Sequence, residues 1–288
     1  MIAVSTRPRR SVLYLPASNP NAIAKARTLA ADVIVLDLED AVAPEHKVAA
    51  RAAAAAAVRE GGFGRREVVI RVNAFGTEWA EADLAAAAAA GPDAVLVPKV
   101  SSAQDVLAYD AALAAAPAHT RLWIMVETCG LMPRLDEVAA LAGSTRLAAF
   151  AMGTNDLAKE MRAQLRPGRA AFLPILSATV CAARAHGLLV FDGVSNEFRD
   201  MAVVRAECDQ GLEFGFDGKC LIHPDQVEPC NAVFTPSAAE LAWARAVVDA
   251  FALPENQGKG VIRIEGKMAE LLHREQAQRL LAIAAAIG

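Results

Sequence analysis

Eight short apolar runs alternate with longer alanine-rich segments over most of this chain, and this alternation limits the possible folds more than any other feature. Strands that are apolar on both faces belong to parallel sheets that helices cover on each side. Eight such units that close on themselves form an α/β fold, the (β/α)8 TIM-type barrel, which we predict here. An open doubly wound sheet is the alternative. No Gly-x-Gly-x-x-Gly follows any of the runs, which disfavours the dinucleotide-binding version of that sheet.

The sequence also predicts where the strands, the helices and the domain boundary lie. We expect strands at residues 12–15, 33–36, 68–72, 94–97, 122–126, 147–152, 188–191 and 212–214. We expect helices at 21–30, 45–59, 133–141, 171–186 and 196–208, and others beginning near 77 and 102. Beyond Pro236 the pattern changes to a helix, a polar link over 253–260, a short strand at 261–264 and a terminal helix over 268–286. The predicted domains are therefore a barrel over 1–235 and a C-terminal helical extension over 236–288.

Composition argues against two classes of partner. Of the 288 residues, 55% are hydrophobic, but much of this fraction is alanine, which favours helices and is only weakly apolar. No stretch reaches the ~18 consecutive apolar residues that a membrane-spanning helix needs. Lys and Arg number 29 against 33 Asp and Glu, so there is no basic excess for a nucleic acid. We expect neither membrane nor nucleic acid as a partner.

The cysteines and the N-terminal segment predict the compartment. The five cysteines are odd in number and form no Cys-x-x-Cys pair, which makes a disulfide framework improbable and favours a reducing, cytoplasmic setting. Basic residues followed by the apolar run from Ser11 resemble a signal peptide, but that run meets Pro16 at once. We expect no targeting segment.

Polar side chains follow six consecutive predicted strands. In barrels of this class the active site forms at the C-terminal ends of the strands. The residues at these ends are Asp37, Glu39, Asp40, Arg71, Asn73, Lys99, Glu127, Asn155, Asp156 and Asp192. A single polar residue at a strand end is ordinary, but the whole set predicts a functional mouth.

The carboxylates of this set predict a metal site. Carboxylates that converge in one cavity raise one another's pKa unless a cation joins them. Oxygen ligands without histidine or cysteine suit Mg²⁺, which takes one or two carboxylates together with water and substrate oxygens. Glu127 and Asp156 lie on adjacent units and form the best direct pair, whereas Glu39 and Asp40 are better placed to hold metal-bound waters. No HExxH and no Cys/His cluster supports zinc.

Two basic residues at the strand ends allow further roles. The fork of Arg71 fits a carboxylate or a developing oxyanion, although a salt bridge to a neighbouring carboxylate is the alternative. Lys99 could form a Schiff base, but nearby carboxylates keep a lysine pKa high and disfavour that chemistry. No Gly-x-Ser-x-Gly elbow supports a serine hydrolase.

Seven short motifs occur in order along the chain. They are RSVLYLP (10–16), LDLEDAV (36–42), RVN (71–73), VET (126–128), GTNDL (153–157), FDGV (191–194) and GKCLIHP (218–224). Together they resemble the citrate lyase beta-subunit-like acyl-CoA lyases of the HpcH/HpaI aldolase superfamily, over about residues 9 to 270. Each motif alone is weak, but the ordered set is specific to the family and says little about the substrate.

The resemblance implies a Mg²⁺-dependent lyase that cleaves a 3-hydroxyacyl-CoA thioester of the citramalyl, malyl or citryl type to acetyl-CoA and a 2-keto acid. By resemblance, Glu127 and Asp156 match metal ligands, Arg71 contacts the reacting oxygens, Glu39 and Asp40 form the acidic pair near the metal waters, and Arg10 contacts the phosphates of coenzyme A. The family is commonly trimeric or hexameric, so a homo-oligomer is expected, with the C-terminal segment covering a neighbouring subunit's site. A free-acid pyruvate-type aldolase without coenzyme A, or a non-catalytic subunit of a larger lyase complex, are the alternatives.

One departure from the family pattern lies in the tail. Many of these lyases carry Gly-Lys-Met, an aliphatic residue and then an aspartate that acts as acid or base in the adjacent subunit. Here the run ends in Ala269 and Glu270, whose side chain is one methylene longer. A misplacement of about 1 Å can cost about 100-fold in rate. Glu270 is therefore either repositioned as the catalytic acid or base, or a plain glutamate at a helix start, which puts thioester hydrolysis in doubt.

Overall fold

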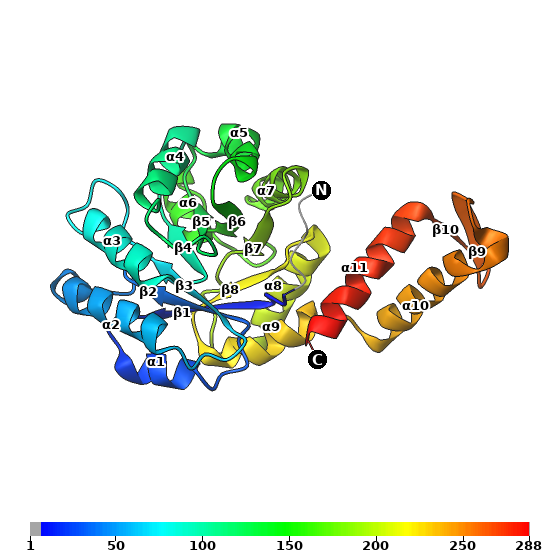
Figure 1. Ribbon diagram of the computed structural model, residues 1–288, viewed down its shortest axis with the longest axis horizontal. Coiled ribbons are helices and arrows are strands. Elements are labelled where there is room, and N and C mark those ends of the chain that lie inside the picture. The colour runs from blue at the N-terminus through cyan, green and yellow to red at the C-terminus, as the bar shows by residue number, and fades with distance from the viewer. Residues whose placement is uncertain (1–6, 288) are drawn as a thin grey trace. The chain divides into compact units, whose positions relative to one another are not determined.

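The computed structural model describes residues 7–287, which fall into two compact units (Figure 1). The first unit spans Arg9–Val233. The second contains the segment from Phe234 onward. In the described chain, no helix is long and apolar enough to cross a membrane.

The first unit is a closed barrel of eight parallel strands in sequential order, which confirms the predicted fold class. The strands are β1 (Ser11–Pro16), β2 (Val33–Asp37), β3 (Glu67–Arg71), β4 (Ala94–Val97), β5 (Arg121–Val126), β6 (Leu147–Met152), β7 (Leu189–Asp192) and β8 (Gly218–Leu221). Side chains fill the interior, where the rings of Trp123 and Phe191 lie 4.9 Å apart. The barrel is therefore a packed core and its polar chemistry is confined to its ends.

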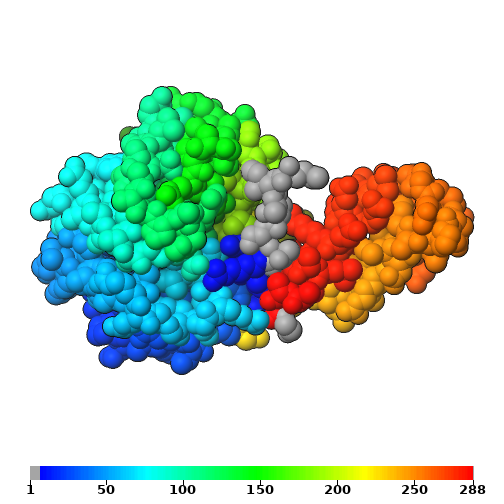
Figure 2. Space-filling view, viewed as in Figure 1, coloured from blue at the N-terminus to red at the C-terminus, as the bar shows by residue number. Residues whose placement is uncertain are grey.

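Helices surround the strands in Figure 1, and Figure 2 shows the outer surface of the molecule in the same orientation. They are α1 (Pro20–Ala26), α2 (Lys47–Glu60), α3 (Ala80–Ala90), α4 (Ala103–Ala112), α5 (Leu135–Ala139), α6 (Thr154–Met161), α7 (Leu173–Ala185), α8 (Met201–Phe214) and α9 (Val227–Phe234). Alanine explains how they pack: α2 buries Ala50, Ala54 and Ala57, whose small side chains allow close approach to the sheet. The alanine runs therefore build the outer ring.

The last strand and several helices differ from the sequence predictions. Residues 212–214 end α8, and the eighth strand is β8. Gly215, at φ 91°, ends α8 and allows the chain to turn. The sequence of β8 did not indicate a strand because it contains the charged residue Lys219. Gly218, at the start of β8, is a glycine because the backbone carbonyls of Arg9 and Arg10 leave no room for a side chain there. The short helices α6 and α9 were not predicted, and the helix expected over 196–208 is α8, which begins at Met201. The terminal helix begins at Leu271, after a strand over Lys267–Glu270.

A buried ion cluster between the strands and the helices explains how Lys219 is tolerated on β8. Its Nζ donates to Asp192 Oδ2 at 2.9 Å and lies 3.2 Å from Glu207 Oε2. Arg169 Nη1 donates to Asp192 Oδ1 at 2.7 Å. Burial alone would raise the pKa of Asp192, but the charges of Lys219 and Arg169 outweigh it and lower that pKa. Asp192 is thus saturated by structural partners, although it lies at a strand end.

The second unit is a small helical element with its own core. It contains α10 (Ala238–Ala252), β9 (Val261–Ile264), β10 (Lys267–Glu270) and α11 (Leu271–Ile287). The two strands pair as an antiparallel hairpin. Glu265 and Gly266 form its turn at φ 48° and 81°, the left-handed pair that a tight two-residue hairpin turn needs. Ile262 and Ala269 on the hairpin pack with Val247 and Phe251 on α10.

We expect Asp192→Ala to destabilise the barrel by about 3–5 kcal/mol, because it removes the buried carboxylate that Arg169 and Lys219 share and leaves Glu207 beside Lys219 alone. Urea unfolding followed by circular dichroism measures this. The matched control is Asp136→Ala, whose carboxylate is 82% exposed and pairs with His186 on the surface. Removal of this surface ion pair should lower the free energy of unfolding by less than about 1 kcal/mol. Equal effects of the two variants would show that the buried cluster does not stabilise the fold.

Candidate functional site

Five of the predicted site residues lie together at the C-terminal ends of the strands. Parallel pairing brings these ends to one side of the barrel, so βα-turns far apart in sequence become neighbours. The five are Glu39, Asp40, Arg71, Glu127 and Asp156. They form two groups, one centred on Arg71 and the other on Lys99, and the charges of Glu39 and Glu127 act on each other between the groups.

The side chain of Arg71, the last residue of β3, is held by Asp37. Its Nε and Nη2 donate to Asp37 Oδ1 and Oδ2 at 2.7 and 2.6 Å, a bidentate pair that is buried. The Tyr14 ring lies beside the guanidinium, with its centroid 5.2 Å from Cζ. Burial opposes the positive charge, but Asp37 and Glu39 together raise the pKa of Arg71. Arg71 is therefore salt-bridged at the mouth, as the alternative interpretation expected, and its contact with reacting oxygens stays a prediction.

Asp37 is a site residue whose partner the sequence analysis did not identify. Its Oδ1 also accepts from the Glu39 backbone N–H at 2.8 Å, which ties the next residues of the loop to the same carboxylate. Asp37 and Arg71 are register partners on β2 and β3. An alignment of the neighbouring predicted strands could have indicated this pairing.

Glu39 and Asp40 are adjacent in sequence but occupy different environments. Glu39 is buried, and its Oε2 lies 2.7 Å from Arg71 Nη1 without hydrogen-bond geometry. Burial raises the pKa of Glu39 to about 8, against the opposing charge of Arg71. The Asp40 side chain is 65% exposed and lies 3.5 Å from the same nitrogen. The two carboxylates therefore cannot be equivalent.

Lys47, the first residue of α2, holds the loop that carries Glu39. Its buried Nζ donates to the carbonyls of Leu38 and Glu39 at 2.8 and 2.9 Å and to Asn73 Oδ1 at 2.7 Å. Asn73 in turn donates to the Leu38 carbonyl. The sequence analysis missed Lys47 because a lysine at a helix start ordinarily faces solvent.

Glu127, Asp156 and Lys99 form the second group. Glu127 Oε1 accepts from the Lys99 backbone N–H at 2.7 Å. Lys99 Nζ lies 2.7 Å from Asp156 Oδ1 and 3.4 Å from Glu127 Oε1. Burial raises the pKa of Glu127 to about 6, although the Lys99 charge opposes the shift. The predicted pair of carboxylates therefore shares one ammonium group.

The donor set around Glu127 fits a hard divalent cation. Glu127 Oε2 is buried and has no hydrogen-bond partner among the described residues. A Cβ on Gly153 would lie 2.7 Å from this oxygen, so the absence of a side chain there leaves room for the carboxylate. No group of three or more His, Cys, Asp or Glu residues with metal-binding geometry occurs in the described part of the chain. Two carboxylates with water and substrate oxygens are, however, an ordinary ligand set for Mg²⁺.

Arg10 does not lie with these groups, and Glu270 belongs to the second unit. Arg10 precedes β1, at the N-terminal end of the barrel, and its Nε and Nη2 donate to Asp32 at 2.8 Å. The contact with coenzyme A phosphates stays a prediction that this placement does not support. Glu270 ends β10 in the second unit, where its backbone N–H donates to His273 Nδ1 at 2.9 Å. It is a strand residue rather than the expected residue at a helix start.

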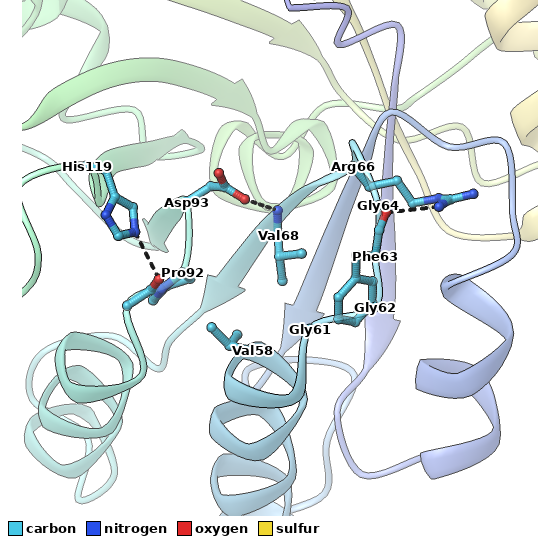
Figure 3. Close-up of a pocket in the computed structure, with 11 residues that line it drawn as sticks. Val58, Gly61, Gly62, Phe63, Gly64, Arg66, Val68, Pro92, Asp93 and His119 are labelled. Carbon is cyan, nitrogen blue, oxygen red and sulfur yellow. Dashed lines mark hydrogen bonds between the residues drawn. The ribbon is translucent and has the colours of Figure 1, made fainter.

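A cavity of about 230 Å³ lies near the N-terminal ends of the strands (Figure 3). Val68 at the start of β3, Asp93 before β4 and His119 line it together with the glycine-rich segment 61–64. Asp93 Oδ2 accepts from the Val68 backbone N–H at 2.8 Å. None of the predicted catalytic or metal-binding residues lines this cavity, so it is separate from the mouth.

Several known proteins are similar to this chain over nearly its whole length. The chain is 48% identical over 287 residues to a (3S)-malyl-CoA thioesterase of Cereibacter sphaeroides, covering 100% of this chain and 98% of that protein. It is 33% identical over 302 residues to an L-malyl-CoA/beta-methylmalyl-CoA lyase of the same organism, with 96% and 94% covered. Protein CitE from Mycobacterium tuberculosis, solved in complex with magnesium, acetoacetate and coenzyme A, superimposes with a TM-score of 0.79 at 29% identity, with 98% and 100% covered.

A sequence model of the HpcH/HpaI aldolase/citrate lyase family matches residues 10–224, which include every predicted site residue except Glu270. The resemblance carried by the seven motifs is thereby confirmed, and with it the class of protein. This chain belongs to the HpcH/HpaI aldolase/citrate lyase family of enzymes.

Proposed function

We propose that this chain is a Mg²⁺-dependent enzyme that hydrolyses the coenzyme A thioester of a malyl-type 3-hydroxy acid. The substrate class rests on the full-length similarity to a (3S)-malyl-CoA thioesterase. The observation in the structure that carries the proposal is the buried Glu127 Oε2, which lacks a protein partner at the mouth of the barrel. An unpaired buried carboxylate oxygen is costly unless a ligand uses it.

Glu127 and Asp156 would hold the Mg²⁺ ion. A bound Mg²⁺ acts as a Lewis acid that polarises an oxygen of the substrate. The protein contributes the position of the two carboxylates: the Lys99 backbone N–H orients Glu127, and Gly153 leaves the space that its carboxylate occupies. Asp156, in the first turn of α6, is less buried and completes the pair.

Arg71 would stabilise negative charge on the reacting thioester oxygen. Asp37 holds its Nε and Nη2, so only Nη1 is directed at Glu39 and the mouth. A fixed donor aimed at a developing oxyanion is typically worth ~3 kcal/mol. The Asp37 pair keeps this donor in place before substrate binds, which avoids reorganisation during the reaction.

Hydrolysis also needs a group that activates water, and we assign this role to Glu270. Its carboxylate would take a proton from water as the oxygen forms a bond to the thioester carbon. The carbon–sulfur bond then breaks, and the proton passes to the departing sulfur, so that the free acid and the coenzyme A thiol leave. We propose that the C-terminal unit supplies Glu270 to the barrel of a neighbouring copy in a homotrimer or hexamer.

Carbon–carbon cleavage of the same substrate is the second candidate. It is favoured by the similarity to an L-malyl-CoA/beta-methylmalyl-CoA lyase and by the presence of Arg71, Glu127 and Asp156. In that reaction a base removes the hydroxyl proton, the bond between the hydroxyl-bearing carbon and the carbon next to the thioester breaks, and the resulting enolate is protonated to acetyl-CoA. The other product is a 2-keto acid.

The products of one incubation distinguish the candidates. With (3S)-malyl-CoA and Mg²⁺, we expect malate and free coenzyme A, detected by a thiol reagent and by mass spectrometry, and no reaction with excess EDTA. Acetyl-CoA together with glyoxylate would identify the lyase instead. Cleavage of short hydroxy-keto acids but not of the thioester would favour a free-acid aldolase. Failure with all of these substrates would contradict an enzymatic role on them.

Glu127→Gln should reduce thioester turnover by about 100-fold or more, because it removes the charge of one proposed metal ligand. Isothermal titration with Mg²⁺ in the absence of substrate should show weaker binding by the same variant. Glu137→Gln, which changes an exposed carboxylate on α5, is the matched control and should leave the thioester turnover and the Mg²⁺ affinity unchanged. Retained Mg²⁺ affinity in Glu127→Gln would contradict the assignment of this ligand.

Mixing two inactive variants tests the shared site. Glu127→Gln and Glu270→Gln should each be inactive alone, whereas refolding them together should restore activity, because some sites then combine an intact carboxylate pair with an intact Glu270. Native mass spectrometry confirms that mixed oligomers form. Mixed oligomers without recovered activity would contradict a site shared between subunits, and full activity of Glu270→Gln alone would contradict its role.

A further inference from the structure

Lys99 has an unusual backbone conformation at the mouth of the barrel. Its φ of 56° is positive, one of four such values among the described residues other than glycine. This left-handed conformation is unfavourable for a residue with a side chain and persists where surrounding contacts enforce it, often at functional sites. Here the contact is with Glu127, whose Oε1 accepts from the Lys99 backbone N–H at 2.7 Å.

The side chain of Lys99 contacts the same pair of carboxylates. Its Nζ lies 2.7 Å from Asp156 Oδ1 and 3.4 Å from Glu127 Oε1. One residue thus supplies a backbone donor and an ammonium to two carboxylates on neighbouring βα units. The Lys99 side chain is 38% exposed, whereas that of Glu127 is 1% exposed. The lysine arm is therefore the member of the group that is freest to move.

The ammonium and a divalent cation would use overlapping positions. Asp156 Oδ1 lies in short contact with Lys99 Nζ. Glu127 Oε1 accepts from the backbone N–H of Lys99 and also lies near its Nζ. A cation bound to these oxygens would repel a positive charge held at the same atoms. Without any cation, the negative charges of the two carboxylates around Lys99 Nζ would repel each other. The site therefore needs one positive charge, and two would compete.

We propose that Lys99 is a built-in counter-ion, whose ammonium holds Glu127 and Asp156 together in the metal-free protein and is displaced when a divalent cation binds. Lys99 therefore weakens the affinity for Mg²⁺ while it holds the two carboxylates in position. This inference rests on the proposed function, because it takes Glu127 and Asp156 as the metal ligands. It adds that a residue outside the ligand set determines how tightly the metal is held.

Isothermal titration with Mg²⁺ and no substrate tests the proposal. Lys99→Met should bind Mg²⁺ about tenfold more tightly than the wild type, since a charge-assisted contact no longer has to be broken. Lys99→Arg keeps a positive charge and should stay close to the wild type. Lys159→Met removes an exposed lysine from α6, the helix that carries Asp156, and controls for the loss of net charge.

Thermal unfolding supplies a second measurement. Without metal, Lys99→Met should melt below the wild type, because its carboxylates lack their counter-ion, and Mg²⁺ should raise its melting temperature by more. Mg²⁺ binding by Lys99→Met alone would also support the proposal. Equal or weaker Mg²⁺ affinity in Lys99→Met would overturn it, and if the wild type still binds the ion the proposed function stands. Absence of Mg²⁺ binding in both proteins would overturn this inference and the metal assignment together.

Discussion

Closure of eight parallel strands is the constraint on which the rest of this structure depends. It brings the strand ends together and crowds carboxylates into a small, poorly hydrated region, where each buried charge needs a partner. The chain meets this need between neighbouring strands or their loops. The pairs are Asp37 with Arg71, Asp192 with Lys219, and Glu127 with Lys99. The charge pattern at the mouth is thus a condition for folding as well as a source of chemistry.

How completely each carboxylate is satisfied separates structural from functional members of this set. Asp192 receives two buried cations, and both oxygens of Asp37 accept from Arg71 and from the backbone. Neither has capacity left for a substrate or a metal. Glu127 keeps one buried oxygen without a partner among the described residues. An acidic residue at a strand end therefore serves stability in the two aspartates, whereas in Glu127 it is available for a ligand.

The sequence predicts this fold well because strand periodicity and helix-forming alanine are local properties. It also predicts that Arg71, Glu127 and Asp156 share a mouth, since that follows from strand order. Features that depend on the burial of a charged side chain are not predictable in this way. The buried Lys219 made β8 unrecognisable as a strand in the sequence. Lys47, at the first position of α2, is buried and donates to the carbonyl of Glu39 in the preceding loop. The pairing of Asp37 with Arg71 depends on strand register, which no single strand specifies. The place of Arg10 directly before the first strand, by contrast, already indicates the N-terminal end of the barrel, away from the mouth.

The division of this chain into two units accounts, on the proposed assignment, for its similarity to both a thioesterase and a lyase. On the proposed assignment, the barrel supplies substrate binding and charge stabilisation, which hydrolysis and carbon–carbon cleavage both require. The reactions differ in whether the base removes a proton from water or from the substrate hydroxyl. Glu270 belongs to the hairpin of the second unit, outside the barrel core. A change in the hairpin can therefore redirect the reaction without disturbing the metal site, so the tail rather than the barrel should determine the product.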